Sequence, residues 1–405
     1  MKKHLFQKER INEENPNWPE FVAREEAIYK KAKDIRSEFE RDYTRILHCT
    51  AYRRLKHKTQ VFYAVQNDHI CTRMEHVNMV ASVSHTIANF LGLNTDVTKA
   101  IATGHDLGHA PFGHTGEEVL KEIVREKLGK IFWHEQNGLR FVDKIETLED
   151  PNGFKHNLNL TYAVRDGIIC HCGEVDENAL FPRSEYIDLE KIKKPNEAAP
   201  YTWEGCVVKL ADKISYLGRD IEDAGMLNIL TKIELRELKS IIKVKSLKEI
   251  NNTSIIHEFI INLCENSSPE TGIRLSDKYI NLMKKIKKFN YEFIYKHERL
   301  RYYKDYAKIV ISSLFSALEG SYNGKNTIKE LQKKGRAYPI LTKNFADWLV
   351  KYSNINNREH RLNKYRNKII YEIGNKEDYY QAIIDFISGM TDYFANNAFK
   401  ELTAF

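Results

Sequence analysis

The sequence predicts an all-α fold with at most one small hairpin, and three observations support this prediction. Apolar residues recur at three- and four-residue steps along most of the chain, which is the period of an amphipathic helix. Helix-capping residues flank these patterns, such as Gly92 after one and Asn94 before the next. Only the short run Lys58–Phe62 is rich in β-branched and aromatic residues, which favours a hairpin or extended segment ending near Asn67.

The expected helices follow one another through the first part of the chain. Loop-forming residues at Asn15–Pro19 precede them, and Pro111 ends the third. Helices are predicted over residues 25–55, 73–91, 95–110, 132–144, 160–170 and 205–230. Residues 173–203 contain three prolines and few apolar runs, and a loop of this length inside a domain is more often functional than idle. From residue 231 the chain is again helical, but without obvious chemistry.

The composition is that of a globular protein. The chain has 405 residues and a net charge of +7, a mild positive balance that suits a protein handling anions such as phosphates. No apolar run approaches the ~18 residues of a membrane-spanning helix, and the first residues lack the apolar core of a signal peptide. We therefore expect a cytoplasmic protein with reduced, buried cysteines and no membrane partner.

Histidines are concentrated in one third of the chain. Eleven of the fifteen lie between His48 and His171, and histidine grouped with carboxylates is typical of metal and acid–base sites. The densest stretch is 100–118, which contains three histidines, one aspartate and two glutamates. Within it, Gly104 and Gly108 flank an adjacent histidine and aspartate, and their lack of side chains would let another helix or a ligand approach closely.

Two other predicted helices carry polar residues on faces that should be buried. His76 lies four residues before Val80, on the inward face of the helix over 73–91. Asp212, Tyr216 and Asp220 form a stripe at four-residue steps on the helix over 205–230. Such a stripe is often only a solvated face. The flanking valines leave little room for solvent here, and we expect Asp212 to point into a site.

Three segments together resemble the HD-domain superfamily: Arg73–His76, Gly104–Glu117 and Leu210–Tyr216. Within it they are similar to the deoxyguanosine-triphosphate triphosphohydrolases and their relatives. Further matching segments are Arg45–His48, Arg53–Leu55, Lys58–Phe62, His134–Gln136, Asn159–Thr161 and Gly389–Tyr393. The resemblance implies a charged N-terminal segment (1–34), an HD-type phosphohydrolase core (35–230) and a helical C-terminal region (231–405) packing on that core. Residues 231–370 do not match in detail.

The resemblance implies one divalent transition metal per subunit, held by His76, His105, Asp106 and Asp212. Two imidazoles and two carboxylates suit Mn²⁺, Fe²⁺, Co²⁺ or Zn²⁺, whereas Mg²⁺ prefers oxygen ligands and would arrive with the triphosphate. The implied reaction is hydrolysis of deoxynucleoside triphosphates, dGTP or several, to deoxynucleoside and tripolyphosphate.

The resemblance also implies roles for other residues. His114, oriented by Glu117, would be the acid–base partner, supported by His134. The phosphate chain would be neutralised by Arg73, His109 and Lys213. The deoxyribose would be selected by Gln60, Tyr216 and Asp220, which grip the 3′-hydroxyl and exclude a 2′-hydroxyl.

Several alternatives stay open from the sequence. The chain could be an HD-type phosphohydrolase of other nucleotides, or a sensor that binds nucleotides or single-stranded DNA with weak hydrolysis. The Lys- and Tyr-rich stretch 278–306 is usually a solvated helix face, with single-stranded DNA binding as its functional alternative. We expect a homo-oligomer, a tetramer or hexamer, and the sequence leaves open whether a dNTP also binds as an effector. Cys170–Cys172 lacks zinc-site spacing, and His85 is given no role.

Overall fold

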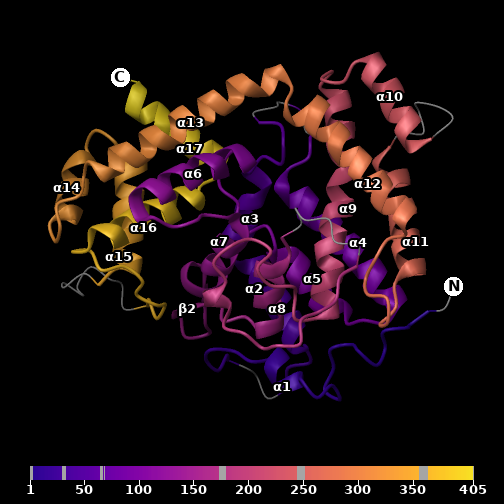
Figure 1. Ribbon diagram of the computed structural model, residues 1–405. Helices are drawn as coiled ribbons and strands as arrows, with labels where there is room; N and C mark the ends of the chain where they lie inside the picture. Colours follow the sequence, from indigo (N-terminus) through magenta and orange to yellow (C-terminus); the bar gives the residue numbers. More distant parts are fainter. Residues whose placement is uncertain are drawn as a thin grey trace.

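The computed structural model describes residues 3–29, 33–63, 67, 69–172, 179–243, 251–354 and 364–404. It is almost entirely helical, which confirms the all-α prediction (Figure 1). The one sheet in this part of the chain has two antiparallel strands, β1 (Thr147–Glu149) and β2 (Lys155–Asn157), with Leu148 opposite His156.

The helices up to residue 230 are α1 (Trp18–Phe21), α2 (Glu38–His48), α3 (Thr50–Arg54), η1 (Leu55–His57), α4 (Arg73–Leu91), α5 (Thr95–Gly104), α6 (Gly113–Leu128), α7 (His134–Arg140), η2 (Phe141–Ile145), α8 (Tyr162–Cys170), η3 (Leu189–Lys191) and α9 (Trp203–Met226). Beyond it are α10 (Lys232–Ile242), α11 (Asn252–Asn266), α12 (Asp277–Phe289), η5 (Asn290–Tyr295), α13 (Glu298–Glu319), α14 (Thr327–Lys334), η6 (Pro339–Lys343), α15 (Asn344–Tyr352), α16 (Lys376–Ser388) and α17 (Asp392–Thr403).

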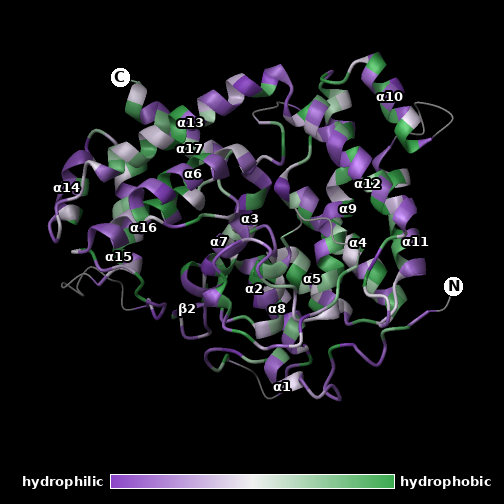
Figure 2. Ribbon diagram, in the orientation of Figure 1, coloured by the Kyte–Doolittle hydropathy of each residue, from purple (hydrophilic) through white to green (hydrophobic). Residues whose placement is uncertain are grey.

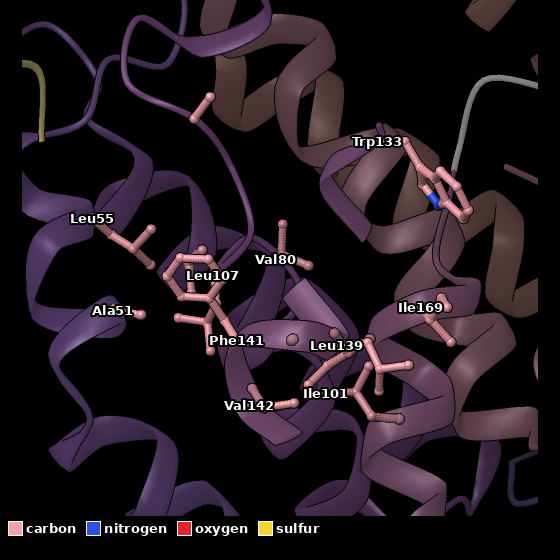
Figure 3. Packing of buried hydrophobic residues seen from close by; sticks show 14 of the residues in the cluster. Ala51, Leu55, Val80, Ile101, Leu107, Trp133, Leu139, Phe141, Val142 and Ile169 are labelled. Carbon is pink, nitrogen blue, oxygen red and sulfur yellow. The ribbon is translucent and has the colours of Figure 1, made fainter. Parts of the chain in front are cut away.

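The centre of the molecule is a group of packed helices in which α5 contacts α2, α4, α8 and α9. Helix α4 begins at a capping box formed by Thr72 and Glu75 and ends at Gly92, whose φ of +85° favours glycine. The side chains labelled in Figure 3 include Ala51 of α3, Val80 of α4, Ile101 of α5, Leu139 of α7 and Ile169 of α8, and all belong to one buried cluster. Burial of this apolar surface holds the helices together.

The two ends of the chain pack against this centre. The charged N-terminal segment buries Phe6 and Ile11, and the Phe6 amide donates to the carbonyl of Leu91. In the C-terminal region, α13 crosses the top of the view in Figure 1 and contacts α6, α16 and α17. Figure 2 shows hydrophilic and hydrophobic residues alternating along α12 and α13, as expected of helices that bury one face. The division of the chain at residues 34 and 230 stays a prediction.

Two predicted elements in the first part of the chain are wrong. The helix expected over 25–55 begins only at Glu38, because Ser37 and Glu40 form a capping box that starts it there. The hairpin expected after Lys58 is not formed by the described residues, which contain only a single bridge between Thr59 and Thr72. Thr59 instead donates to a carboxylate of the C-terminal region. Residues 64–66 and 68 of this expected hairpin lie outside the described residues.

The remaining predicted helices agree with the structure apart from one end. The expected helices over 73–91, 132–144, 160–170 and 205–230 correspond to α4, α7 with η2, α8 and α9. The helix expected to reach Pro111 ends at Gly104 instead, and residues 105–108 form a turn. All six cysteines are buried, as expected. In the described part of the chain, no helix has both the length and the apolar character needed to cross a bilayer.

Candidate active site

The turn after α5 lies directly against the backbone of α7. A Cβ on Gly108 would lie 2.0 Å from the His134 carbonyl oxygen and 2.1 Å from the Gly138 nitrogen, so only glycine fits. The Asn137 side chain donates to the Gly108 carbonyl oxygen at 2.7 Å and ties the turn to α7. The close approach expected at this glycine is therefore confirmed. It also explains why α5 ends early, since the chain must turn to reach α7.

Replacing Gly108 with alanine is expected to lower the free energy of unfolding by about 3 kcal/mol, because the new methyl group overlaps backbone atoms that cannot move away. Urea unfolding followed by circular dichroism measures this loss. The matched control is Gly225→Ala near the end of α9, where a Cβ meets nothing within 4 Å. That change is expected to be neutral or to stabilise by up to ~1 kcal/mol. Equal stability of the two variants would refute the close approach.

Four residues from three elements converge above this turn. His76 from α4 lies with its Nε2 2.9 Å from Oδ1 of Asp212 on α9. His105 in the turn has its Nε2 3.7 Å from the same Asp212 oxygen and 3.5 Å from Oδ1 of Asp106. All except Asp212 are fully buried, and His76, His105 and Asp212 offer ligand atoms within 4.8 Å of one another. The predicted metal ligands are thus brought together.

The His105 ring is oriented as metal-binding imidazoles usually are. Its Nδ1 donates to the Ala102 carbonyl oxygen at 2.6 Å, which leaves Nε2 as the atom with the lone pair. This Nε2 is buried and has no hydrogen-bond partner among the described residues. A buried nitrogen of this kind facing two carboxylates fits a divalent cation. The donor set of two imidazoles and two carboxylates suits a transition metal.

Asp106 lies between a buried cation and several imidazoles. Its Oδ2 accepts from Nη1 of Arg73 at 2.9 Å, and its Oδ1 lies 3.0 Å from Nε2 of His109. Burial alone would raise the pKa of Asp106, but His109, His105 and Arg73 lower it well below its usual value. Asp106 is therefore an anion that links the metal-ligand group to a cationic side of the site.

A second group of imidazoles lies on that side. The His134 ring stacks on the His109 ring with centroids 3.8 Å apart, and His134 Nδ1 lies 3.0 Å from Oε2 of the buried Glu117. His114 lies 3.8 Å from the same oxygen with its side chain 67% exposed. Glu117 therefore lies closer to His134 than to His114, whereas the sequence predicted that Glu117 orients His114. The exposed His114 is the imidazole with room to reach a ligand.

The predicted substrate residues come from the loop after η1, from the turn after α5, and from α4 and α9. Within the described residues, Nε and Nη2 of Arg73 and Oε1 of Gln60 are buried without a hydrogen-bond partner. Lys213 is buried and Tyr216 half-buried on α9. Asp220 accepts a hydrogen bond from the Tyr295 hydroxyl, and burial raises the pKa of Asp220 to about 6. Both Tyr216 and Asp220 thus lie on the helix that carries Asp212.

Some residues at the site had no role from the sequence. The centroid of the His171 ring lies 5.0 Å from that of the His105 ring. In the sequence, the cysteines on either side of His171 suggested only a zinc site, and His171 received no role. Asp392 at the start of α17 accepts from the Thr59 amide at 2.9 Å and from the Phe112 amide at 2.8 Å. It thereby fixes the loop before Gln60 and the turn before α6, where Phe112 adopts a φ of +65°. The segment containing Asp392 matched the family, but without a role.

Comparison with known proteins agrees with this architecture. The HD domain family model matches residues 73–217, the span that contains all four converging residues. Three relatives, each named deoxyguanosinetriphosphate triphosphohydrolase-like protein, cover most of the chain. That of Caldanaerobacter subterraneus subsp. tengcongensis is 32% identical over 91% of this chain and 86% of its own length. Those of Clostridium tetani and Rickettsia bellii are 32% and 31% identical over 90% and 91% of this chain, and 85% and 92% of their own lengths. The chain therefore belongs to the deoxyguanosinetriphosphate triphosphohydrolase-like family of HD-domain hydrolases.

Proposed function

We propose that the protein hydrolyses deoxynucleoside triphosphates, dGTP or several, to deoxynucleoside and tripolyphosphate with a divalent transition metal. The observation that carries the proposal is the position of Arg73. One of its nitrogens binds Asp106 of the metal-ligand group, and its two other nitrogens are buried without partners among the described residues. An anion that accepted hydrogen bonds from these nitrogens would lie next to the predicted metal ligands. A phosphate chain is an anion of this kind.

His76, His105, Asp106 and Asp212 would hold the metal. Bound there, Mn²⁺, Fe²⁺, Co²⁺ or Zn²⁺ supplies Lewis-acid polarisation of a phosphoryl oxygen and lowers the pKa of water, and Mg²⁺ would accompany the triphosphate. Arg73 and Lys213 would neutralise the phosphate chain, and His109 would contact it as a neutral imidazole, because burial holds its pKa well below the usual value. These donors are held in place by the surrounding protein and need not reorganise as negative charge moves during the reaction.

His114 acts as the acid–base partner, with Glu117 and His134 behind it. Attack on the α-phosphate makes the 5′-oxygen the leaving group, and this oxygen needs a proton. The Glu117 carboxylate holds the proton-bearing imidazoles in place. Burial alone would lower the pKa of His134, but the carboxylates of Glu135 and Glu117 raise it to about 9. His134 therefore carries positive charge at neutral pH and stabilises the negative charge beside it.

Gln60, Tyr216 and Asp220 bind the sugar. Gln60 offers a buried side-chain oxygen without a partner in the described chain, and such an oxygen suits the 3′-hydroxyl as donor. Tyr216 and the hydrogen-bonded Asp220–Tyr295 pair would contact the sugar from α9 and η5. A 2′-hydroxyl would meet groups that already have partners, which favours deoxyribose over ribose.

A product-resolved assay tests the proposal. With Mn²⁺, the purified protein is expected to convert a dNTP to deoxynucleoside and tripolyphosphate, separated by anion-exchange chromatography. The four dNTPs are assayed singly and mixed, beside the ribonucleotides and nucleoside monophosphates. Recovery of dNMP with pyrophosphate would contradict the proposal. Activity that appears only in mixtures would establish a dNTP effector, and oligonucleotide binding without turnover would favour the sensor alternative.

The assembly and compartment are part of the same proposal. We expect a cytoplasmic homo-oligomer of four or six subunits, because that is what the family resemblance implies. Light scattering of the purified protein measures the number of subunits. A monomer at all concentrations would refute this part without affecting the assay above.

A further inference from the structure

A stack of aromatic rings joins the C-terminal region to the loops of the candidate active site. The Tyr63 ring, three residues after Gln60, lies parallel to the Tyr303 ring of α13, with centroids 5.0 Å apart and planes 15° apart. Tyr306, one turn later on α13, stacks on Tyr63 at 6.2 Å. Phe112 meets Tyr303 edge-on at 6.4 Å. The stack places α13, whose sequence did not match the family in detail, beside the loop that follows Gln60 and the turn that precedes His114.

The three tyrosines of this stack differ in what their hydroxyl groups contact. Tyr306 donates to the side-chain oxygen of Asn396 at 2.7 Å, and Tyr63 accepts from the amide nitrogen of the same residue. The Tyr303 hydroxyl is buried and has no hydrogen-bond partner among the residues that the structure describes. A buried polar group left unpaired costs ~1–3 kcal/mol. Native proteins keep few such groups, and each requires an explanation.

The charges around Tyr303 indicate what could pair with it. Burial raises the pKa of the Tyr303 phenol well above its usual value; Asp392 and Tyr63 raise it further, and Arg73 lowers it. The hydroxyl therefore keeps its proton. The Tyr303 ring meets Phe112, and the next residue, Gly113, lies beside Nη2 of Arg73. Both oxygens of Asp392 already accept hydrogen bonds from Thr59 and Phe112. The Tyr303 hydroxyl nevertheless bonds to neither oxygen in the structure, so a bound molecule can supply its acceptor.

Arg73, like Tyr303, has donor groups that lack an acceptor. Its Nε and Nη2 are buried donors without a partner in the described segments, and Nη2 lies 3.6 Å from the position of a Cβ on Gly113, next to Phe112. The site thus combines a phenolic donor and two guanidinium donors, none with an acceptor. A group that offers several acceptor oxygens and carries negative charge satisfies all three, and a phosphate chain is such a group.

We infer that Tyr303 is a substrate-binding residue, contributed by α13, that donates its hydroxyl hydrogen to the phosphate chain bound by Arg73. The inference rests on the proposed function, because it assigns Tyr303 to the triphosphate of that substrate. It gives the C-terminal region a direct part in substrate binding. Tyr303 has no part in proton transfer, since its role is to hold the phosphate chain.

The test compares Tyr303→Phe with Tyr302→Phe, its neighbour, whose side chain is 66% exposed. Phenylalanine keeps the ring stack and removes only the hydroxyl. The Mn²⁺-loaded full-length protein is titrated with inorganic tripolyphosphate in a calorimeter, and KM and kcat are measured with a dNTP. Tyr303→Phe is expected to weaken tripolyphosphate binding and to raise KM, each by about tenfold, because a hydrogen bond to a charged group is lost. The kcat of Tyr303→Phe and all constants of Tyr302→Phe are expected to stay within about twofold of the unmodified protein.

Each outcome separates this inference from the proposed function. Equal tripolyphosphate affinity of Tyr303→Phe and the unmodified protein would overturn the inference and leave dNTP hydrolysis intact. Failure of the unmodified protein to bind tripolyphosphate would also overturn it. If no dNTP is hydrolysed but Tyr303→Phe still weakens tripolyphosphate binding, the proposed function fails and the phosphate contact stands. A circular dichroism spectrum shared by both variants shows that the fold is retained.

Discussion

Replacing Asp106 with alanine is expected to lower kcat/KM for dNTP hydrolysis by about a thousandfold and to abolish tight metal binding. Asp106 contacts the two predicted imidazole ligands of the metal and also Arg73 and His109. Its two oxygens lie 2.9 Å from Arg73 and 3.0 Å from His109, and it faces the Nε2 atoms of His76 and His105. Loss of its charge therefore removes a metal ligand and leaves Arg73 unpaired.

The measurements are metal content by mass spectrometry and turnover after dialysis against a chelator. Readdition of Mn²⁺ is expected to restore the unmodified protein and not the variant. Because an unpaired buried cation also lowers stability, Asp106→Asn serves as a second variant that keeps the shape and removes only the charge. The matched control is Asp277→Ala, whose side chain is 88% exposed. Normal metal content in a folded Asp106→Asn protein would place the metal elsewhere.

Replacing Glu117 with glutamine is expected to lower kcat by about 10²- to 10³-fold, the range associated with an acid–base group. Glu117 is buried, and it is the carboxylate that contacts both His134 and His114. Without its charge, His134 is held less firmly and gives up its proton more readily. The neighbouring Glu118, which is exposed, provides the control Glu118→Gln.

The pH dependence of this variant gives a second test. The His134 pKa of about 9 means that its charge is present below that pH and is lost as pH rises through it. The alkaline limb of kcat in the unmodified protein is therefore expected near pH 9. In Glu117→Gln one of the two carboxylates that raise the pKa is neutral, so the limb is expected to move to lower pH. An unchanged alkaline limb would exclude His134 as the group that titrates.

Local sequence patterns predicted the helices that carry the metal-ligand group. The three- and four-residue spacing of apolar residues placed His76 and Asp212 on inward faces, and the structure has both in long helices, α4 and α9. The capping residues Asn94 and Gly92 marked helix ends correctly, because a cap depends on contacts within a few residues. The charged start of the chain gave no hint that Phe6 and Ile11 would be buried against the centre.

The errors arose where contacts between distant segments override local preference. Helix α5 ends at Gly104, short of Pro111, because the following turn must meet the backbone of α7. Lys58–Phe62 has the composition of a strand, but its partner is the Asp392 carboxylate and not a second strand. The nearest imidazole to Glu117 is His134 from another helix, whereas spacing along one helix favoured His114.

The sequence by itself therefore determined the fold class, the family and the residue types that converge at the candidate site, because each depends on spacing within single segments. Only the tertiary structure decided how these segments meet. It set the orientation of the His105 ring through the Ala102 carbonyl, the position of two loops through Asp392, and the ring stack that places Tyr303 of α13 beside Tyr63 and Phe112. These contacts join residues far apart in the chain, and no local pattern encodes which of many distant partners a buried polar group will meet.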